Sequence, residues 1–196
     1  MDFVILKGLE IDKFLNDVID LRIKVFREYP YLYDGNLEYE REYFKDFIKD
    51  STARVILVKD ADKVVAVATS IALSNAHLCD DTHKPFVEKG YDVERFYYYG
   101  EIMIDQDYRN QGISKQIYQL REKEAKSLGF DKLCFATIIK DSDNIPADYF
   151  DPNKMWKSMG FVERLDMRVE CSWPKIQADG STKEQTSGLN FWIKEF

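Results

Sequence analysis

The hydrophobic positions of the chain follow a helical period in four places. From Ile11 onward, apolar residues recur at three- and four-residue spacing, which predicts an amphipathic helix that ends before Pro30. A second helix is predicted from Leu37 to about Lys49, with its aromatic residues on one side. A long helix is expected over 111–128, followed by a C-terminal glycine. A shorter one is expected after 151, with Asp-Pro at its start and glycine at its end.

Other runs have the β-branched or alternating composition of strands. The strands predicted in this way cover residues 3–7, two segments of 53–72 joined by a turn at 60–62, 96–104, 131–139, 162–173 and 189–196. A short helix is expected near 85–89 and a polar loop at 177–188. The order β-α-α-β-β-β-α-β-α-β-β predicts a mixed α/β domain. The two hairpins in it exclude a fully parallel, doubly wound sheet.

The length and net charge of the chain indicate the number of domains and the kind of partner. The 196 residues, 45% of them hydrophobic, predict one domain over 1–196 with a substantial core. The net charge of −7 and the absence of a basic stripe argue against nucleic acid as a partner.

The three cysteines and two histidines are few and widely spaced, so a metal site is not expected. Disulfides are not implied either, and Cys134, in an apolar run, is expected to be buried. The N-terminus lacks the basic and apolar regions of a signal peptide, and no segment has the roughly 18 apolar residues of a membrane span. We therefore expect a soluble, cytoplasmic protein that does not bind membranes.

The segment IDQDYRNQGIS, residues 104–114, joins a predicted strand to a predicted helix through a polar turn. Backbone N–H groups at such a junction are suited to holding phosphates, and Gly112 allows the backbone to approach a ligand closely. Neither the dinucleotide fingerprint nor the P-loop motif is present. The alternative is that Gly112 is a turn glycine with no ligand.

Residues 109–114, RNQGIS, resemble the R/Q-x-x-G-x-G/A loop of the GNAT (Gcn5-related N-acetyltransferase) superfamily. The segments MWKSMGF, REYPYLYDG, YYYGEIMI, FATIIKDSDNIPADY and FWIKEF extend the resemblance to essentially the whole chain, toward one bacterial branch of these proteins. The resemblance implies a GNAT-like fold, with helices flanking a central, mostly antiparallel sheet that contains a splayed parallel pair. Ser114 departs from the Gly or Ala of the family loop.

The resemblance implies acetyl-CoA as the co-substrate and no metal. Its diphosphate would bind the 109–114 loop, and its pantetheine arm would pair with the strand before that loop. The residues expected at the cofactor are Met103, Ile104, Arg109, Asn110, Gln111, Gly112, Ile113, Ser114 and Trp156. Arg109 either adds charge at the diphosphate or only caps the turn, and Trp156 either packs against the cofactor arm or belongs to the core.

Glu101 is the candidate general base, because it is the only carboxylate inside the apolar and aromatic run FYYYGEIMI. The alternatives are an edge position facing water or a structural hydrogen bond. In the family a tyrosine on the short helix often acts as the acid, but here Trp156 occupies that place. Tyr149, a few residues upstream, is the candidate acid, with water as the alternative.

The resemblance places the acceptor beside the first two helices and their connection. Tyr29, Tyr31, Tyr33 and Asp34 offer aromatic faces and a carboxylate that suit an amine, and Tyr98 is the strand tyrosine expected to face the cleft. The alternative is that the tyrosines plug the loop while Asp34 makes a turn. The expected function is acetyl transfer to a primary amine of a small molecule or peptide, by a monomer or homodimer. The alternative is an acyl-CoA sensor without turnover.

Overall fold

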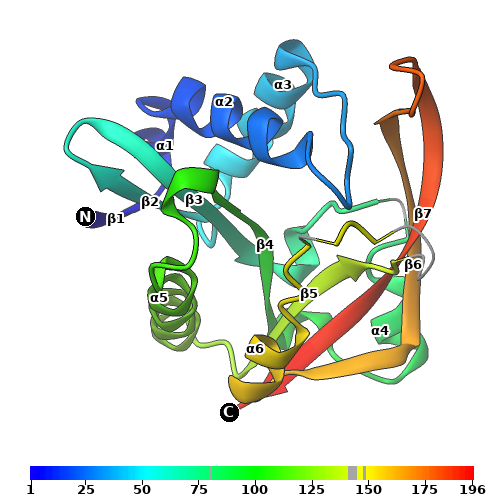
Figure 1. The fold of residues 1–196 in the computed structure, drawn as a ribbon. Coiled ribbons are helices and arrows are strands. Elements are labelled where there is room, and N and C mark those ends of the chain that lie inside the picture. Colours follow the sequence, from blue (N-terminus) through cyan, green and yellow to red (C-terminus); the bar gives the residue numbers. More distant parts are fainter. Residues whose placement is uncertain (80, 141–144, 148) are drawn as a thin grey trace.

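A seven-stranded sheet runs through the protein in the order β1-β2-β3-β4-β5-β7-β6 (Figure 1). The computed structural model describes residues 1–79, 81–140, 145–147 and 149–196. The strands are β1 Asp2–Leu6, β2 Arg54–Asp60, β3 Lys63–Ala72, β4 Phe96–Ile104, β5 Lys132–Ile138, β6 Val162–Ile176 and β7 Thr182–Glu195. The parallel pair is β4 with β5, and the other neighbours are antiparallel.

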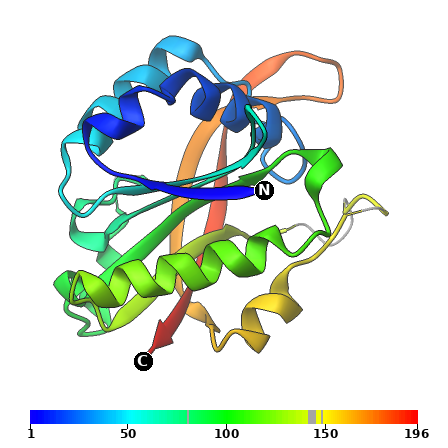
Figure 2. The same cartoon turned by 90° about the vertical axis from the view of Figure 1, so that its left-hand side faces the viewer.

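Helices cover both faces of the sheet (Figure 2). The helices are α1 Leu9–Asp12, α2 Leu15–Phe26, α3 Leu37–Lys49, α4 Lys84–Glu88, α5 Ile113–Ser127 and α6 Asn153–Ser158. Residues of α1 to α4 belong to one hydrophobic core, which includes Val18, Phe44 and Phe86. Residues of α5 and α6 pack against the opposite face, where Ile117 and Tyr118 are buried. The predicted mixed α/β architecture is confirmed, and no helix among the described residues is long and apolar enough to cross a membrane.

The parallel strands β4 and β5 stay together for only three register pairs. These are Phe96 with Lys132, Tyr97 with Leu133 and Tyr98 with Cys134. Beyond Tyr98, β4 continues beside β3, and β5 continues beside β7. The two strands therefore diverge at their C-terminal halves, as the family resemblance implies.

A bulge lies on β4 at Gly100 and Glu101, two residues after the last of these pairs. Ser70 of β3 is opposite Tyr99, and Ala68 is opposite Ile102, so Thr69 alone faces both Gly100 and Glu101. A Cβ atom at position 100 would lie 2.5 Å from the Thr69 hydroxyl oxygen. Glycine is therefore required where the two strands come this close.

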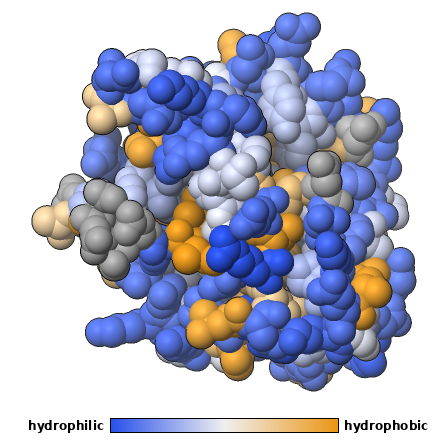
Figure 3. Space-filling model, turned by 90° about the vertical axis from the view of Figure 1, so that its right-hand side faces the viewer, coloured by the Kyte–Doolittle hydropathy of each residue, from blue (hydrophilic) through white to orange (hydrophobic). Residues whose placement is uncertain are grey.

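The polar loop predicted over residues 177–188 is only partly a loop in the structure. Only 177–181 form the turn of a hairpin, and β7 begins at Thr182 and pairs with β6 as far as Ile193. The hairpin extends along one side of the molecule (Figure 1), and the face it occupies is largely hydrophilic (Figure 3). Because much of this part of the hairpin is exposed and held by backbone hydrogen bonds, its residues lack the hydrophobic alternation that marks a half-buried strand.

Cys79 and Cys171 form a disulfide, with their Cα atoms 5.4 Å apart, so the expectation that no disulfide occurs was wrong. The two residues are 92 positions apart in the chain, and no sequence pattern connects them. The fold brings the segment after β3 against β6, which places the two thiols together. Cys134 is a free, buried thiol, as predicted.

Candidate active site

A cavity of about 1140 Å³ opens between α2, α3 and the sheet. Its walls come from the two helices and their connection, from β3 and β4 at the bulge, and from β6. The connection after α2 is attached to the hairpin, because Ile176 donates its N–H to the Leu32 carbonyl at 2.8 Å and Asp34 donates to the Pro174 carbonyl at 3.0 Å. This pairing closes one side of the cavity.

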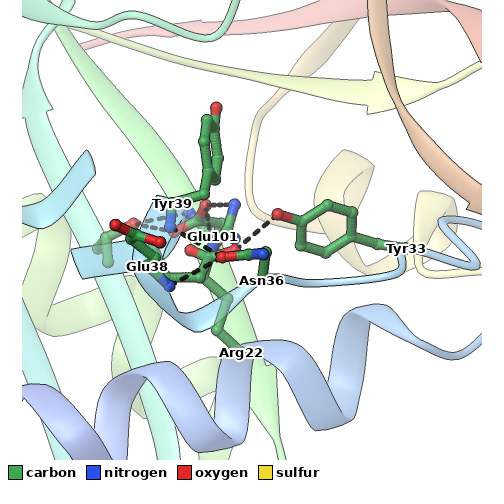
Figure 4. Close-up of polar contacts among 8 residues, drawn as sticks. Arg22, Tyr33, Asn36, Glu38, Tyr39 and Glu101 are labelled. Carbon is green, nitrogen blue, oxygen red and sulfur yellow. Dashed lines mark hydrogen bonds and ion pairs between the residues drawn. The ribbon is translucent and has the colours of Figure 1, made fainter. Parts of the chain in front are cut away.

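Arg22 extends from α2 toward β4 and joins two carboxylates (Figure 4). Its Nη1 atom pairs with Glu40 of α3, and its Nε and Nη2 atoms each lie 3.0 Å from Oε1 of Glu101. Its guanidinium also lies 4.9 Å from the ring centre of Phe26. Burial disfavours the charged form, but Glu101 and Glu40 outweigh it and raise the pKa of Arg22. Arg22 is therefore a fixed cation between two acids.

Glu40 is fully buried beneath this cation. The Tyr33 hydroxyl donates to its Oε1 atom at 2.8 Å, whereas Oε2 has no partner among the described residues. Burial raises the pKa of Glu40, and the Arg22 charge and the Tyr33 hydrogen bond oppose that rise. Glu40 thus depends on Arg22 for its charge compensation.

Glu101 lies at the bulge, where its backbone and its side chain are both held by Thr69. The Thr69 hydroxyl accepts the Glu101 N–H at 2.9 Å and donates to Oε2 of the carboxylate at 2.9 Å. With Arg22 on Oε1, each carboxylate oxygen has one partner, and the side chain retains 15% exposure at the cavity wall. The carboxylate is oriented, yet still open to a ligand.

Three of the five residues predicted to bind the acceptor line this cavity, namely Tyr31, Tyr33 and Tyr98. Tyr29 and Asp34 are not among the lining residues. Asp34 pairs with Arg27 at 3.5 Å and accepts from the Thr182 hydroxyl at 2.6 Å. The Tyr29 ring meets the Tyr149 ring edge-on, with centres 5.1 Å apart.

The 109–114 loop follows the C-terminal end of β4 and leads into α5, which packs on the face of the sheet opposite the cavity. Gly112 precedes the helix with φ +78°, and Asn110 also has a positive φ of 61°. No described residue accepts a hydrogen bond from the backbone N–H groups of Gln111 to Ser114. A Cβ atom at Gly112 would meet nothing within 4 Å. The loop therefore presents free donors and open space at a helix N-terminus, which suits an anionic group.

The side chain of Arg109 is directed back into the protein. It makes a bidentate pair with Glu28 at 2.8 Å for each hydrogen bond, and its Nε donates to the Ile104 carbonyl at 3.1 Å. The Arg109 guanidinium is thus engaged by Glu28 and by the Ile104 carbonyl. Met103 is buried and pairs with Val67 of β3.

Trp156 of α6 lies among the aromatic residues beneath α5. Its indole N–H donates to the Tyr118 hydroxyl at 2.7 Å, and its ring lies 4.9 Å from that of Phe135. Tyr118 in turn packs against Tyr99 and Phe135, the residues directly beyond the last pair of β4 with β5. Tyr149 is half-buried, and the Lys140 ammonium lies 5.1 Å from the centre of its ring.

Sequence reasoning missed Arg22, Glu40 and Arg121, although one signal was available. Each is a charged residue in a buried helical stripe at i, i+4 spacing: Val18-Arg22-Phe26, Glu40-Phe44 and Ile113-Ile117-Arg121-Ala125. A charge in such a stripe requires a buried partner.

In the part of the chain that the structure describes, no group of three or more His, Cys, Asp or Glu residues is placed to hold a metal ion.

A family model described as the Acetyltransferase (GNAT) family matches residues 17–161 of the chain. This range contains the helices around the cavity, the bulge, the 109–114 loop and α6. No curated protein matches the sequence.

Solved acetyltransferase structures align over nearly the whole chain. A ribosomal-protein-alanine N-acetyltransferase from Brucella melitensis is 12% identical with a TM-score of 0.62, and the alignment covers 98% of this chain and 99% of that one. The ribosomal-protein-S18-alanine N-acetyltransferase from Escherichia coli is 13% identical with a TM-score of 0.57, covering 99% and 94%. A NatC complex bound to Gag peptide and CoA is 11% identical with a TM-score of 0.55, covering 100% and 99%. At these identities the likeness establishes a shared fold.

We expect Arg22→Met to lower the free energy of unfolding by about 3–5 kcal/mol, because it leaves a buried carboxylate without its cation. Without Arg22, the raised pKa of Glu40 rises further. A carboxyl with a higher pKa in the folded state stabilises the fold at low pH and loses that contribution as the pH rises through the folded pKa. The variant should therefore lose more of its free energy of unfolding near pH 8 than near pH 5. Near pH 8 the loss should reach about 3–5 kcal/mol.

Urea unfolding at the two pH values measures this effect. The double variant Arg22→Met/Glu40→Gln is the matched control, since it removes the buried charge and should recover much of the lost stability. Equal deficits at both pH values would show that Glu40 does not depend on Arg22.

Proposed function

Because this chain belongs to the GNAT acetyltransferase family, we propose that it transfers an acetyl group from acetyl-CoA to a primary amine of a small molecule or peptide. The observation that carries the proposal is the place of Glu101. Its oriented carboxylate faces a cavity large enough for an acceptor and lies beside the point where β4 and β5 separate. Acceptor and thioester would approach each other there from opposite faces of the sheet.

The residues at the start of α5 fit the diphosphate of acetyl-CoA. Backbone N–H groups from Gln111 to Ser114 are free to donate, and Gly112 leaves space above them. When bound, acetyl-CoA supplies the acetyl thioester. In this proposal Met103 and Ile104 face its pantetheine arm through their backbone, and Asn110, Ile113 and Trp156 complete the contact surface.

Glu101 is proposed as the general base that accepts the proton of the attacking amine. Arg22 and Thr69 each hold one of its oxygens, so the carboxylate keeps one direction while an acceptor binds. Positioning of this kind contributes to catalysis because the base must lie within hydrogen-bonding reach of the proton it takes.

Two phenols are candidates for donating a proton to the leaving thiolate. Tyr149 is the one suggested by its position near α6. Tyr118 is supported by a contact: it accepts the Trp156 N–H, and its own hydroxyl proton has no acceptor among the described residues. Burial raises the pKa of Tyr118 to about 12, so it keeps its proton at neutral pH.

The lining of the cavity favours an amine that carries a second positive charge. Arg22 is the one cationic Lys or Arg side chain among the lining residues, and two glutamates neutralise it. Glu38 of α3 and Glu184 of β7 also line the cavity, and no salt bridge engages either one within the described residues. Aromatic side chains, among them Tyr31, Tyr39 and Trp173, provide faces for a cation.

Acetyl-CoA and CoA should each raise the melting temperature of the protein, whereas NAD should not, since a ligand that binds the native state stabilises it. Gly112→Trp should abolish this rise. Gly180→Trp is the matched control, because Gly180 also has a positive φ with nothing within 4 Å but lies in the hairpin turn.

Glu101→Gln should keep this rise in melting temperature with acetyl-CoA while lowering kcat by about 10²- to 10⁴-fold. Binding without turnover of any amine would instead identify an acyl-CoA sensor.

Putrescine, butylamine and γ-aminobutyrate, which have similar lengths, test the charge preference. We expect kcat/KM to fall in that order, measured as release of free CoA. Glu38→Gln and Glu184→Gln should each lower the value for putrescine by up to about fivefold, as expected for an exposed ion pair, and leave butylamine unaffected. Equal values for the three amines would refute a cationic acceptor.

Tyr118→Phe and Tyr149→Phe distinguish the two proton donors. Loss of the true donor should lower kcat by on the order of 10²-fold without changing KM for acetyl-CoA. The other variant serves as the control, since each removes one hydroxyl from a packed aromatic residue. If both variants retain full kcat, water supplies the proton.

A further inference from the structure

Arg121 is a buried cation that the roles assigned so far do not use. It lies on α5, across the sheet from the cavity, and is 1% exposed. Its Nη2 atom donates to the Thr69 carbonyl at 2.7 Å and to the Glu101 carbonyl, while its Nε atom has no partner among the described residues. Its guanidinium lies 4.9 Å from the ring centre of Tyr99.

No described carboxylate pairs with Arg121. This distinguishes it from Arg54, which is also largely buried and donates to backbone carbonyls but has Glu124 at 3.1 Å. Burying a cation without a counter-charge destabilises a fold, because the lost hydration is not replaced. Burial lowers the pKa of Arg121, yet a guanidinium remains charged in proteins. A charge kept at this cost indicates a specific requirement at this position.

The two carbonyls that Arg121 contacts belong to the bulge. Thr69 is the single β3 residue opposite Gly100 and Glu101, so a regular ladder of hydrogen bonds is interrupted there. Arg121 supplies a donor to the carbonyl on each strand. On the cavity side, the Thr69 hydroxyl and Arg22 hold the Glu101 amide and carboxylate. The bulge is thus held from both faces of the sheet.

We propose that Arg121 is a positioning residue that fixes the β4 bulge from behind and thereby sets the direction of the Glu101 carboxylate. The proposal rests on the role given to Glu101 above. Arg121 touches neither the cavity nor the carboxylate itself, so it acts through the backbone of residues 69 and 101. Displacement of a catalytic group by about 1 Å can cost about 10²-fold in rate.

The test compares Arg121→Gln and Arg121→Lys with Arg54→Gln and Arg54→Lys. We expect Arg121→Gln to lower kcat by about 10²-fold with KM for acetyl-CoA unchanged, because the cofactor loop is not involved. Arg121→Lys should recover part of kcat, since an ammonium can still donate to a carbonyl. The Arg54 variants should lower the melting temperature while retaining kcat.

Amide hydrogen exchange provides a readout that does not require turnover. The Glu101 N–H, which donates to the Thr69 hydroxyl, should exchange on the order of tenfold faster in Arg121→Gln than in Arg54→Gln. If Arg121→Gln does not fold, the same comparison is made with the two lysine variants. If the wild type acetylates no amine, the function proposed for Glu101 fails, and exchange alone decides whether Arg121 holds the bulge. Equal exchange at Glu101 in both variants, or equal losses of kcat, would overturn the proposal.

Discussion

The candidate site depends on one local constraint, the bulge at which Thr69 faces both Gly100 and Glu101. Glycine is needed there because a Cβ atom would collide with the Thr69 hydroxyl. That hydroxyl is in turn the group that binds both the amide and the carboxylate of Glu101. The same interruption lies two residues beyond the last register pair between β4 and β5. The orientation of one carboxylate and the divergence of two strands thus begin within two residues of each other on β4.

The two faces of the sheet carry different charged groups around this bulge. On the cavity face, Arg22 is compensated by Glu40 and Glu101, and further carboxylates, such as Glu38, line the cavity, which is the basis for the cationic acceptor that we propose. On the α5 face, the free N–H groups before the helix and the uncompensated Arg121 favour negative charge. Such a division suits a reaction between an amine and a phosphate-bearing thioester, which approach from opposite sides and develop negative charge where they meet.

Much of the fold could be predicted from the sequence because periodicity reports burial. The β-branched hairpin at 53–72 and the Ile113–Ser127 helix are half-buried elements, and their patterns placed them to within two or three residues. Residues 182–188 lack that pattern because their side chains are polar and mostly exposed, and the Cys79–Cys171 bond joins segments 92 residues apart. Glu101 could be proposed from the sequence because a carboxylate is unusual in an apolar strand. Arg22, Glu40 and Arg121 carried the same signal within helices, but their partners are set by tertiary packing, which spacing alone does not reveal.

A crystal structure of the protein with CoA and putrescine bound would show whether cofactor and acceptor meet at Glu101. We expect the diphosphate to lie against the N–H groups of Gln111 to Ser114 and the thiol end to lie between β4 and β5 beyond Tyr98. One amino group of putrescine should reach the Glu101 carboxylate. CoA bound away from the start of α5, or putrescine seated with neither amine near Glu101, would contradict this expectation.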